Sequence, residues 1–362
     1  MSKKKNIIAI AAAVVAVAGA AVFFVMRGGR QEQTYDPSLH RFKSINIVSA
    51  YIALVEKPDA KRALLSDDGA ETLRPYFENA GVKCLPKGTE GRFDLVIATS
   101  PRLSDWKGLS ENVGENGAVM WLMDVRKTTI AEFRDRLAAF PCPETHFWMP
   151  GETDWVLSGR IKPRKIKLSA MLDLFARDDA LADLTEAQCD SVGDVFASFA
   201  GYRDTIEPAF TGNLEARVKP EFFVTKDIPD IPWIVAGDVD EDILRQNARD
   251  VRSKQIVRRV VIEGNMLSQE GKSEEAVDKW AGALLHNPHD TMLLDRVYRL
   301  AVNARTFQKV GNFKAAAKCY ETMVGIRPTD SAALVEYSSC MRILGEKELA
   351  DRAFERAREL TQ

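Results

Sequence analysis

The sequence predicts an α/β domain with a largely parallel sheet, followed by an all-α array of helical hairpins and preceded by one transmembrane helix. Three observations predict this organisation: an apolar run near the start of the chain, alternating strand-like and helix-like segments in the middle, and a recurring residue pattern over the last hundred residues. The 362 residues leave room for about two domains.

Bulk composition excludes several classes of protein. The chain is 46% hydrophobic and 28% charged, which is typical of a folded protein and not of a disordered one. The net charge of -2 gives no basic field, so we expect no nucleic-acid partner. The five cysteines form no CxxC pair, and His286 and His289 flank Pro288 at an expected helix end. We therefore predict no metal site.

The apolar run near the N-terminus is long enough to cross a bilayer. Three lysines precede twenty uncharged residues, Ile7 to Met26. At about 1.5 Å per residue they span about 30 Å, the thickness of the hydrocarbon core. A cleaved signal peptide is the alternative, because Ala18-Gly19-Ala20 offers the small residues of a cleavage site. The apolar run continues beyond that point, so we expect an uncleaved membrane anchor over residues 1–30.

The orientation of this anchor is less strongly marked. Lys3, Lys4 and Lys5 favour a cytoplasmic N-terminus, although Arg27 and Arg30 lie close to the other end of the apolar run. These charges favour a bacterial inner-membrane protein whose bulk lies on the periplasmic side.

The middle of the chain, residues 31–232, predicts the α/β domain. Asp67-Asp68-Gly69 opens a helical pattern that Gly81 stops, and Thr128 or Thr129 caps a helix that Pro141 ends. Helices of about ten to fifteen residues between strands favour a parallel sheet. Further helices are expected over 168–210 and an extended, proline-containing connector over 218–237. The expected strands are short apolar runs at 45–48, 62–66, 82–85, 93–98, 118–123, 145–148 and 155–158.

The last part of the chain, residues 233–362, contains an internal repeat. A glycine, an alanine five residues later, an aromatic residue four further on and then a proline recur with shifts of forty and thirty-four residues. The glycine permits a tight turn between helices, the alanine permits their close approach, and the aromatic residue fills the space against the next hairpin. The first unit is Gly271, Ala276, Trp280 and Pro288, the second is Gly311, Ala316, Tyr320 and Pro328, and the third is Gly345, Ala350 and Phe354.

These positions resemble the tetratricopeptide repeat (TPR). Gly264, Leu267 and Ala283 supply further small and large positions of the first unit. The second unit departs from the pattern, because its first helix must be six residues longer and Met323 stands where a small residue is expected. The resemblance implies an all-α solenoid of about three hairpins whose groove binds a protein or peptide.

Residues 92–160 resemble the spermidine synthase-like family within the S-adenosylmethionine (SAM)-dependent methyltransferase fold. The resemblance depends on Arg92 to Ile97, Gly117 to Leu122 and the segment around Trp148 and Trp155. It implies a Rossmann-like domain and, if the family's activity is kept, transfer chemistry on a polyamine or a similar amine.

Two departures from that family indicate a non-catalytic domain. No glycine follows Ile45 to Val48, the first expected strand, although a nucleotide needs such a turn. The family's catalytic aspartate would follow the strand at 93–98, where the chain instead reads Ala98-Thr-Ser-Pro101. Asp67 and Asp68 are candidates for holding a ribose, but they equally suit a helix cap.

The sequence therefore leads to three hypotheses. The first is a membrane-anchored TPR scaffold with no cofactor and no catalytic residue, which binds a protein partner such as a membrane-embedded spermidine synthase-like homologue. The second is an active SAM-type transferase. The third is an accessory protein for envelope assembly or secretion.

Overall fold

The computed structural model describes most of the chain after the expected anchor. The described residues are 37–99, 106–126, 128–187, 189, 191–210, 212–219, 231, 234–235, 237, 239–287 and 290–361. Contacts divide the chain into a unit of residues 1–36 and a unit of residues 37–362. The expected anchor and its flanking charges lie outside the described residues. Within the described part, no helix combines the length and apolar character that crossing a membrane requires.

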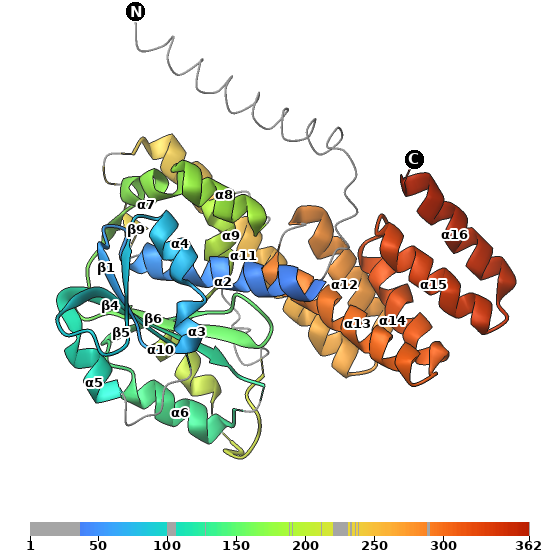
Figure 1. The fold of residues 1–362 in the computed structure, drawn as a ribbon, viewed down its shortest axis with the longest axis horizontal. Helices are drawn as coiled ribbons and strands as arrows, with labels where there is room; N and C mark the ends of the chain where they lie inside the picture. Colours follow the sequence, from blue (N-terminus) through green and yellow to red (C-terminus); the bar gives the residue numbers. More distant parts are fainter. Residues whose placement is uncertain are drawn as a thin grey trace, which may run out of the picture. The chain divides into compact units, whose positions relative to one another are not determined.

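A seven-stranded sheet with the order β2-β1-β3-β4-β6-β5-β8 forms the centre of the α/β part (Figure 1). Three pairings are parallel (β1 with β2, β1 with β3, β3 with β4) and three are antiparallel (β4 with β6, β6 with β5, β5 with β8). The strands are β1 (Arg62–Leu65), β2 (Lys83–Pro86), β3 (Phe93–Thr99), β4 (Val113–Asp124), β5 (Glu144–Trp148), β6 (Asp154–Arg160) and β8 (Phe199–Tyr202).

The expected α/β architecture is confirmed, but the sheet is mixed and not largely parallel. The parallel half is β2-β1-β3-β4. Helices lie in the connections from β1 to β2 and from β3 to β4, whereas residues 87–92 join β2 to β3 without a helix. The turn of residues 149–153 joins β5 to β6 directly, and so short a connection makes antiparallel neighbours. The closing pair of strands expected at 145–148 and 155–158 is this hairpin.

Helices cover both faces of the sheet. Alternate residues of β4 point to opposite faces, so Trp121 packs in the core on the α6 side and Met120 in the core on the α2 side. The capping box of Thr129 and Glu132 starts α6, which identifies Thr129 as the cap. The helices of this part are α2 (Pro37–Glu56), α3 (Asp68–Glu71), α4 (Arg74–Asn79), α5 (Trp106–Glu111), α6 (Ile130–Ala139), α7 (Leu168–Phe175), α8 (Asp178–Glu186), α9 (Val192–Ala197) and α10 (Arg203–Ile206).

Helix α2 corrects the prediction of a first strand at 45–48. Its residues 44–56 are all buried, since the helix packs on β4, β6, α4, α8 and α9 and also contacts the helical array. A helix buried on every side has no polar face, so its sequence lacks the 3.6-residue period. A short apolar run of this kind does not distinguish a strand from a buried helix.

Two further strands lie in segments that were predicted to be helical or to form an extended connector. The segment 168–210 is helical except at β8, where Phe199 to Tyr202 pair with β5 at the edge of the sheet. Within the connector expected at 218–237, Ile234–Val235 forms β9, which pairs in parallel with β7 (Ile166–Lys167). Most of that connector lies outside the described residues.

The C-terminal part is helical, as expected, and its helices pair as three successive hairpins, drawn from orange to red in Figure 1. Helix α13 has 19 residues and α15 has 13, so the first helix of the second hairpin is longer by the six residues that the repeat spacing requires. The hairpins are α11 (Glu241–Gln269) with α12 (Ser273–His286), α13 (Thr291–Lys309) with α14 (Phe313–Ile326), and α15 (Ser331–Ile343) with α16 (Lys347–Thr361).

Candidate functional site

A cavity of about 210 Å³ lies at the carboxyl ends of β1, β3 and β4, next to α2. The chain passes from β1 outward to β2 on one side and returns to β3 on the other. In an open α/β sheet this reversal of strand order is the usual position of a ligand site. The polar residues that line this switch-point cavity are Asn46, Ser49, Thr72, Thr99, Asp124 and Asp154.

Asp67, a candidate for ribose binding, lies between the ends of β1 and β3. Its carboxylate accepts hydrogen bonds from the amide of Ala70 (2.9 Å), the amide of Thr99 (2.7 Å), the hydroxyl of Thr99 (2.5 Å) and the hydroxyl of Ser66 (3.3 Å). A ribose hydroxyl would therefore have to displace one of these donors. Asp68 is exposed in the first turn of α3.

The loop after β1 packs closely against the end of β3. A Cβ atom on Gly69 would lie 2.1 Å from the hydroxyl oxygen of Thr99, so only glycine allows this approach. The resemblance to the spermidine synthase-like family predicts an aspartate directly after this strand, whereas Thr99 ends the strand and hydrogen-bonds Asp67. Asp105, the nearest later aspartate, lies outside the described residues.

The switch-point cavity is small and acidic. Asp124 and Asp154 face each other across β4 and β6, and Arg126 pairs with Asp124. Ser49 is fully buried, and its hydroxyl has no hydrogen-bond partner within the described part of the chain. The two aspartates are the only ionisable groups among the described residues that line the cavity, so it offers hydrogen bonds and negative charge but neither a histidine base nor a thiol.

The switch-point cavity is smaller than the usual site of a drug-sized ligand. Sites for drug-sized ligands occupy roughly 300–1,000 Å³. At about 210 Å³ the switch-point cavity has room for a small polar molecule, and an adenosine-containing cofactor would require Thr99 or α2 to move.

A second cluster of ionisable groups is buried at the other end of α2. The carboxylate of Glu56 contacts His146 Nδ1 at 2.6 Å, accepts a hydrogen bond from the Ser158 hydroxyl at 2.6 Å and pairs with Arg160 at 3.4 Å. Burial opposes ionisation of Glu56, but the charge and hydrogen bond of His146 outweigh it and hold the pKa of Glu56 below its usual value. The serine contacts the carboxylate and not the imidazole, so these residues do not form a nucleophilic triad. The cluster is a buried ion-pair network.

The recurring residues of the C-terminal part occupy equivalent positions in the three hairpins. Gly271, Gly311 and Gly345 have φ values of 81°, 77° and 85° in the turns between paired helices, a left-handed conformation that glycine adopts without strain. Ala276, Ala316 and Ala350, five residues further on, are all fully buried. Leu267 is partly buried against the same core, and Ala283 and Met323 are both buried. Pro328 follows the end of α14, and Pro288 lies outside the described residues.

The aromatic residues of the three repeat units differ in burial. Trp280 and Tyr320 are buried, whereas Phe354 in the last helix is 44% exposed. A Cβ atom on Gly264 would lie 2.6 Å from Trp280 Nε1, so Gly264 permits α11 and α12 to approach around the indole. The indole nitrogen donates hydrogen bonds to Val261 O and Asn265 Oδ1.

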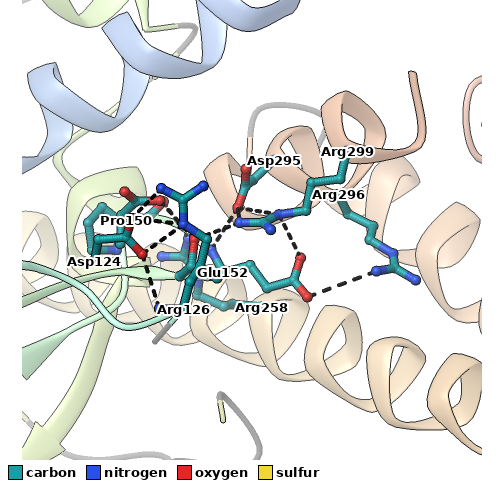
Figure 2. A network of polar contacts seen from close by, with 10 residues as sticks. Asp124, Arg126, Pro150, Glu152, Arg258, Asp295, Arg296 and Arg299 are labelled. Carbon is teal, nitrogen blue, oxygen red and sulfur yellow. Dashed lines mark hydrogen bonds and ion pairs between the residues drawn. The ribbon is translucent and has the colours of Figure 1, made fainter. Parts of the chain in front are cut away.

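The first two hairpins carry a polar junction with the α/β part (Figure 2). The carboxylate of Glu152, in the β5–β6 turn, lies 3.3 Å from Arg299 and 3.9 Å from Arg296, both on α13. The amide of Glu152 donates to Asp295 at 3.0 Å.

Buried and apolar contacts complete this junction. Arg258 of α11 donates to the carbonyl of Pro150 at 3.3 Å, and burial lowers its pKa although Asp290 pairs with it. Helix α11 also packs on α9, and α13 packs on α2. One hydrophobic cluster runs from the α6 face of the sheet into the hairpins. The α/β part therefore covers one face of the first helices of two hairpins.

The third hairpin leaves the equivalent face open. Asp290 caps α13 and Asp330 caps α15. The fifth residue after the cap is therefore Asp295 in α13 and Val335 in α15. Asp295 is fully buried at the junction, whereas Val335 is 41% exposed. The neighbouring positions Glu336 and Ser339 are also exposed. The face of α15 that includes these three residues is called the α15 face below.

Several site residues were not predicted from the sequence. Asn46 and Ser49 were assigned to a strand or the loop after it, which hid their place in the cavity. Asp124 ends a correctly predicted strand, and the rule that ligands bind at carboxyl ends of strands would have identified it. Glu152 had no local signal, because its partners are about 145 residues away in the sequence.

Comparison with known proteins adds no assignment. No protein-family model matches the chain, and no curated protein matches it. Within the residues searched for metal sites, the described part of the chain has no cluster of three metal-ligating side chains.

Proposed function

We propose that this protein is a scaffold that binds a protein partner through a TPR-like helical array, and that its spermidine synthase-like α/β domain has a structural role. The observation that carries the proposal is the α15 face. The α/β part covers the first helices of two hairpins, while the third hairpin exposes Val335 at the position where α13 has the buried Asp295. Because the α/β part covers the equivalent position of α13, the exposed Val335 is the position that we propose for a further protein contact.

The proposed partner is a membrane protein, and a membrane-embedded spermidine synthase-like homologue is the first candidate. The apolar segment 7–26 supports this choice, since an anchor would hold the array at a membrane surface. A role in envelope assembly or secretion would use the same α15 face with a different partner. A topology reporter fused to the C-terminus separates the two, because a cytoplasmic location contradicts the envelope role.

A charge on the α15 face tests the scaffold role. We expect Val335→Arg in the full-length protein to reduce partner recovery about tenfold or more, because an apolar contact is replaced by an unpaired charge. Leu285→Arg is the matched control, since Leu285 is an exposed leucine on α12, outside this face. Affinity purification from the native cell with quantitative mass spectrometry makes the comparison. Equal recovery of every partner with Val335→Arg and wild type would refute the proposed surface.

An active SAM-type transferase is the second candidate, and the switch-point cavity with its unpaired Ser49 hydroxyl favours it. We expect calorimetry with SAM, decarboxylated SAM and methylthioadenosine to give no micromolar binding, because the cavity is too small and the loop after β1 is closed on Thr99. Saturable micromolar binding that Ser49→Val weakens would restore the enzyme hypothesis.

A further inference from the structure

The first hairpin of the helical array carries an open groove between α11 and α12, with a volume of about 650 Å³. It shares no lining residue with the switch-point cavity. Its charged lining residues are Glu275, Asp278 and Lys279, and Lys279 pairs with Glu263 at 2.9 Å. This surface is called the α11–α12 groove below. Its apolar lining residues are Ile256, Val257, Val260, Leu267 and Ala283.

The corresponding surface of the second hairpin is covered by α12. A shift of forty residues relates the two hairpins, so Arg296 of α13 is the counterpart of Ile256. Helix α12 packs on α14, and the guanidinium carbon of Arg296 lies 4.7 Å from the centre of the Trp280 ring. Ile256, by contrast, is 47% exposed. The α11–α12 groove is therefore the exposed counterpart of a surface on which this chain already seats a helix.

The sizes of the facing residues differ between the two surfaces. Gly325 of α14 lies against α12, because a Cβ atom on it would be 2.7 Å from the side chain of Val277. Its counterpart in the first hairpin is Leu285, which is larger and 85% exposed. Beside it, a Cβ atom on Gly282 would meet nothing within 4 Å, so the groove is open there. A helix seated on this surface needs a small residue opposite Leu285, where α12 has Val277.

The charge is reversed between the two surfaces. The hydrogen bond and charge of Glu321 raise the pKa of Lys318 on α14, and the charge of Glu274 on α12 adds to this effect across the two hairpins. The counterpart of Lys318 in the first hairpin is Asp278, which is exposed and lines the groove. Asp278 forms no hydrogen bond or ion pair with another described residue. A helix in the groove would therefore complement Asp278 with a cation where α12 carries Glu274.

We propose that the α11–α12 groove binds an amphipathic helix of a partner protein, seated as α12 is seated on the second hairpin. From a lysine or arginine, this helix has a small residue three positions later and an aromatic residue six positions later. These side chains meet Asp278, Leu285 and Ile256, respectively. The site is independent of the proposed scaffold surface, because it belongs to the first hairpin and shares no residue with the α15 face.

A synthetic peptide derived from α12 tests this proposal. It spans residues 273–286 and carries Glu274→Lys and Val277→Ala, and the comparison peptide carries Val277→Ala alone. In fluorescence anisotropy titrations with the full-length protein, we expect saturable one-to-one binding that is about fivefold tighter for the lysine peptide. Adding Trp280→Ala to that peptide is expected to weaken binding about tenfold or more. The absence of saturable binding up to about 1 mM would overturn the proposal.

Variants of the full-length protein locate the bound peptide. We expect Asp278→Lys to reverse the preference between the two peptides and Leu285→Arg to weaken the lysine peptide about tenfold. Val335→Arg, on the α15 face, and Glu90→Lys, the same kind of charge change in an exposed loop, should leave binding unchanged.

Two outcomes would contradict the assigned groove. An unchanged preference in Asp278→Lys would mean that the peptide binds elsewhere, including on α14 in place of α12. Sedimentation velocity of the full-length protein gives the other outcome. A dimer that Leu285→Arg dissociates would assign the groove to a second copy of this chain and not to a partner's helix.

Discussion

At the scale of single residues, ionisable side chains that are buried or partly buried in the α/β part stabilise the fold. The carboxylate of Asp67 ties the loop after β1 to the end of β3, although the sequence also made it a candidate for binding a ribose. Glu56 joins the last turn of α2 to β5 and β6 through His146 and Ser158. Each carboxylate is held by several donors, which is the usual condition for burying such a charge.

The pair of Glu56 and His146 predicts how stability depends on pH. Burial lowers the pKa of His146, but the negative charge of Glu56 outweighs burial and raises it above its usual value. The stability that protonated His146 contributes is therefore fully present below about pH 6.5 and is lost as pH rises through the folded pKa of His146. The pKa of Glu56 is lowered in the folded protein, so the stability that its carboxylate contributes is present above about pH 4.3. This stability is lost as pH falls through the folded pKa of Glu56.

We expect His146→Asn to lower the free energy of unfolding by roughly 3–5 kcal/mol near pH 5–6, because it removes one charge of a buried pair. The difference from wild type should shrink above the folded pKa of His146. Urea unfolding from pH 5 to 9 measures it, with the exposed His286→Asn as the control. A difference that does not change with pH would show that His146 is neutral in the folded protein.

At the scale of elements, the approach of α11 and α12 depends on one glycine. We expect Gly264→Ala to lower the free energy of unfolding by roughly 1–3 kcal/mol, because its Cβ would meet the buried indole of Trp280. Gly282→Ala in α12 is the control, because its Cβ meets nothing within 4 Å, and we expect it to be stabilising by up to about 1 kcal/mol. Denaturant unfolding compares them. Equal signs for the two variants would contradict the close packing around Trp280.

The elements also show which features a sequence predicts well. The turn glycines, the buried alanines and the longer α13 follow from local spacing, and all were predicted. The strands of the parallel half and the cap at Thr129 also carry local signals. Helix α2 was mistaken because burial on every side removes its period, and β8 was missed because pairing with β5 defines an edge strand of four residues. The switch-point cavity could not be predicted once α2 was taken for a strand.

At the scale of the whole molecule, the β5–β6 turn fastens the sheet to the hairpins. We expect Glu152→Lys to lower the free energy of unfolding by roughly 1–3 kcal/mol, because it places a third cation beside Arg296 and Arg299. The two arginines keep about a quarter of their surface exposed, so solvent screening favours the lower end of this range. Glu90→Lys, the same charge change in an exposed loop, is the control. If calorimetric unfolding gives equal midpoints for the two variants, the ion pairs do not hold the junction.

The shared junction has a practical consequence for anyone who divides this gene into expression fragments. A cut before α11 would strip α9, α2 and the β5–β6 turn of their neighbours and bring Arg258 and Asp295, now fully or almost fully buried, into water. We expect both fragments to be poorly soluble when expressed alone and soluble when they are co-expressed, since each fragment covers the interface that the other exposes.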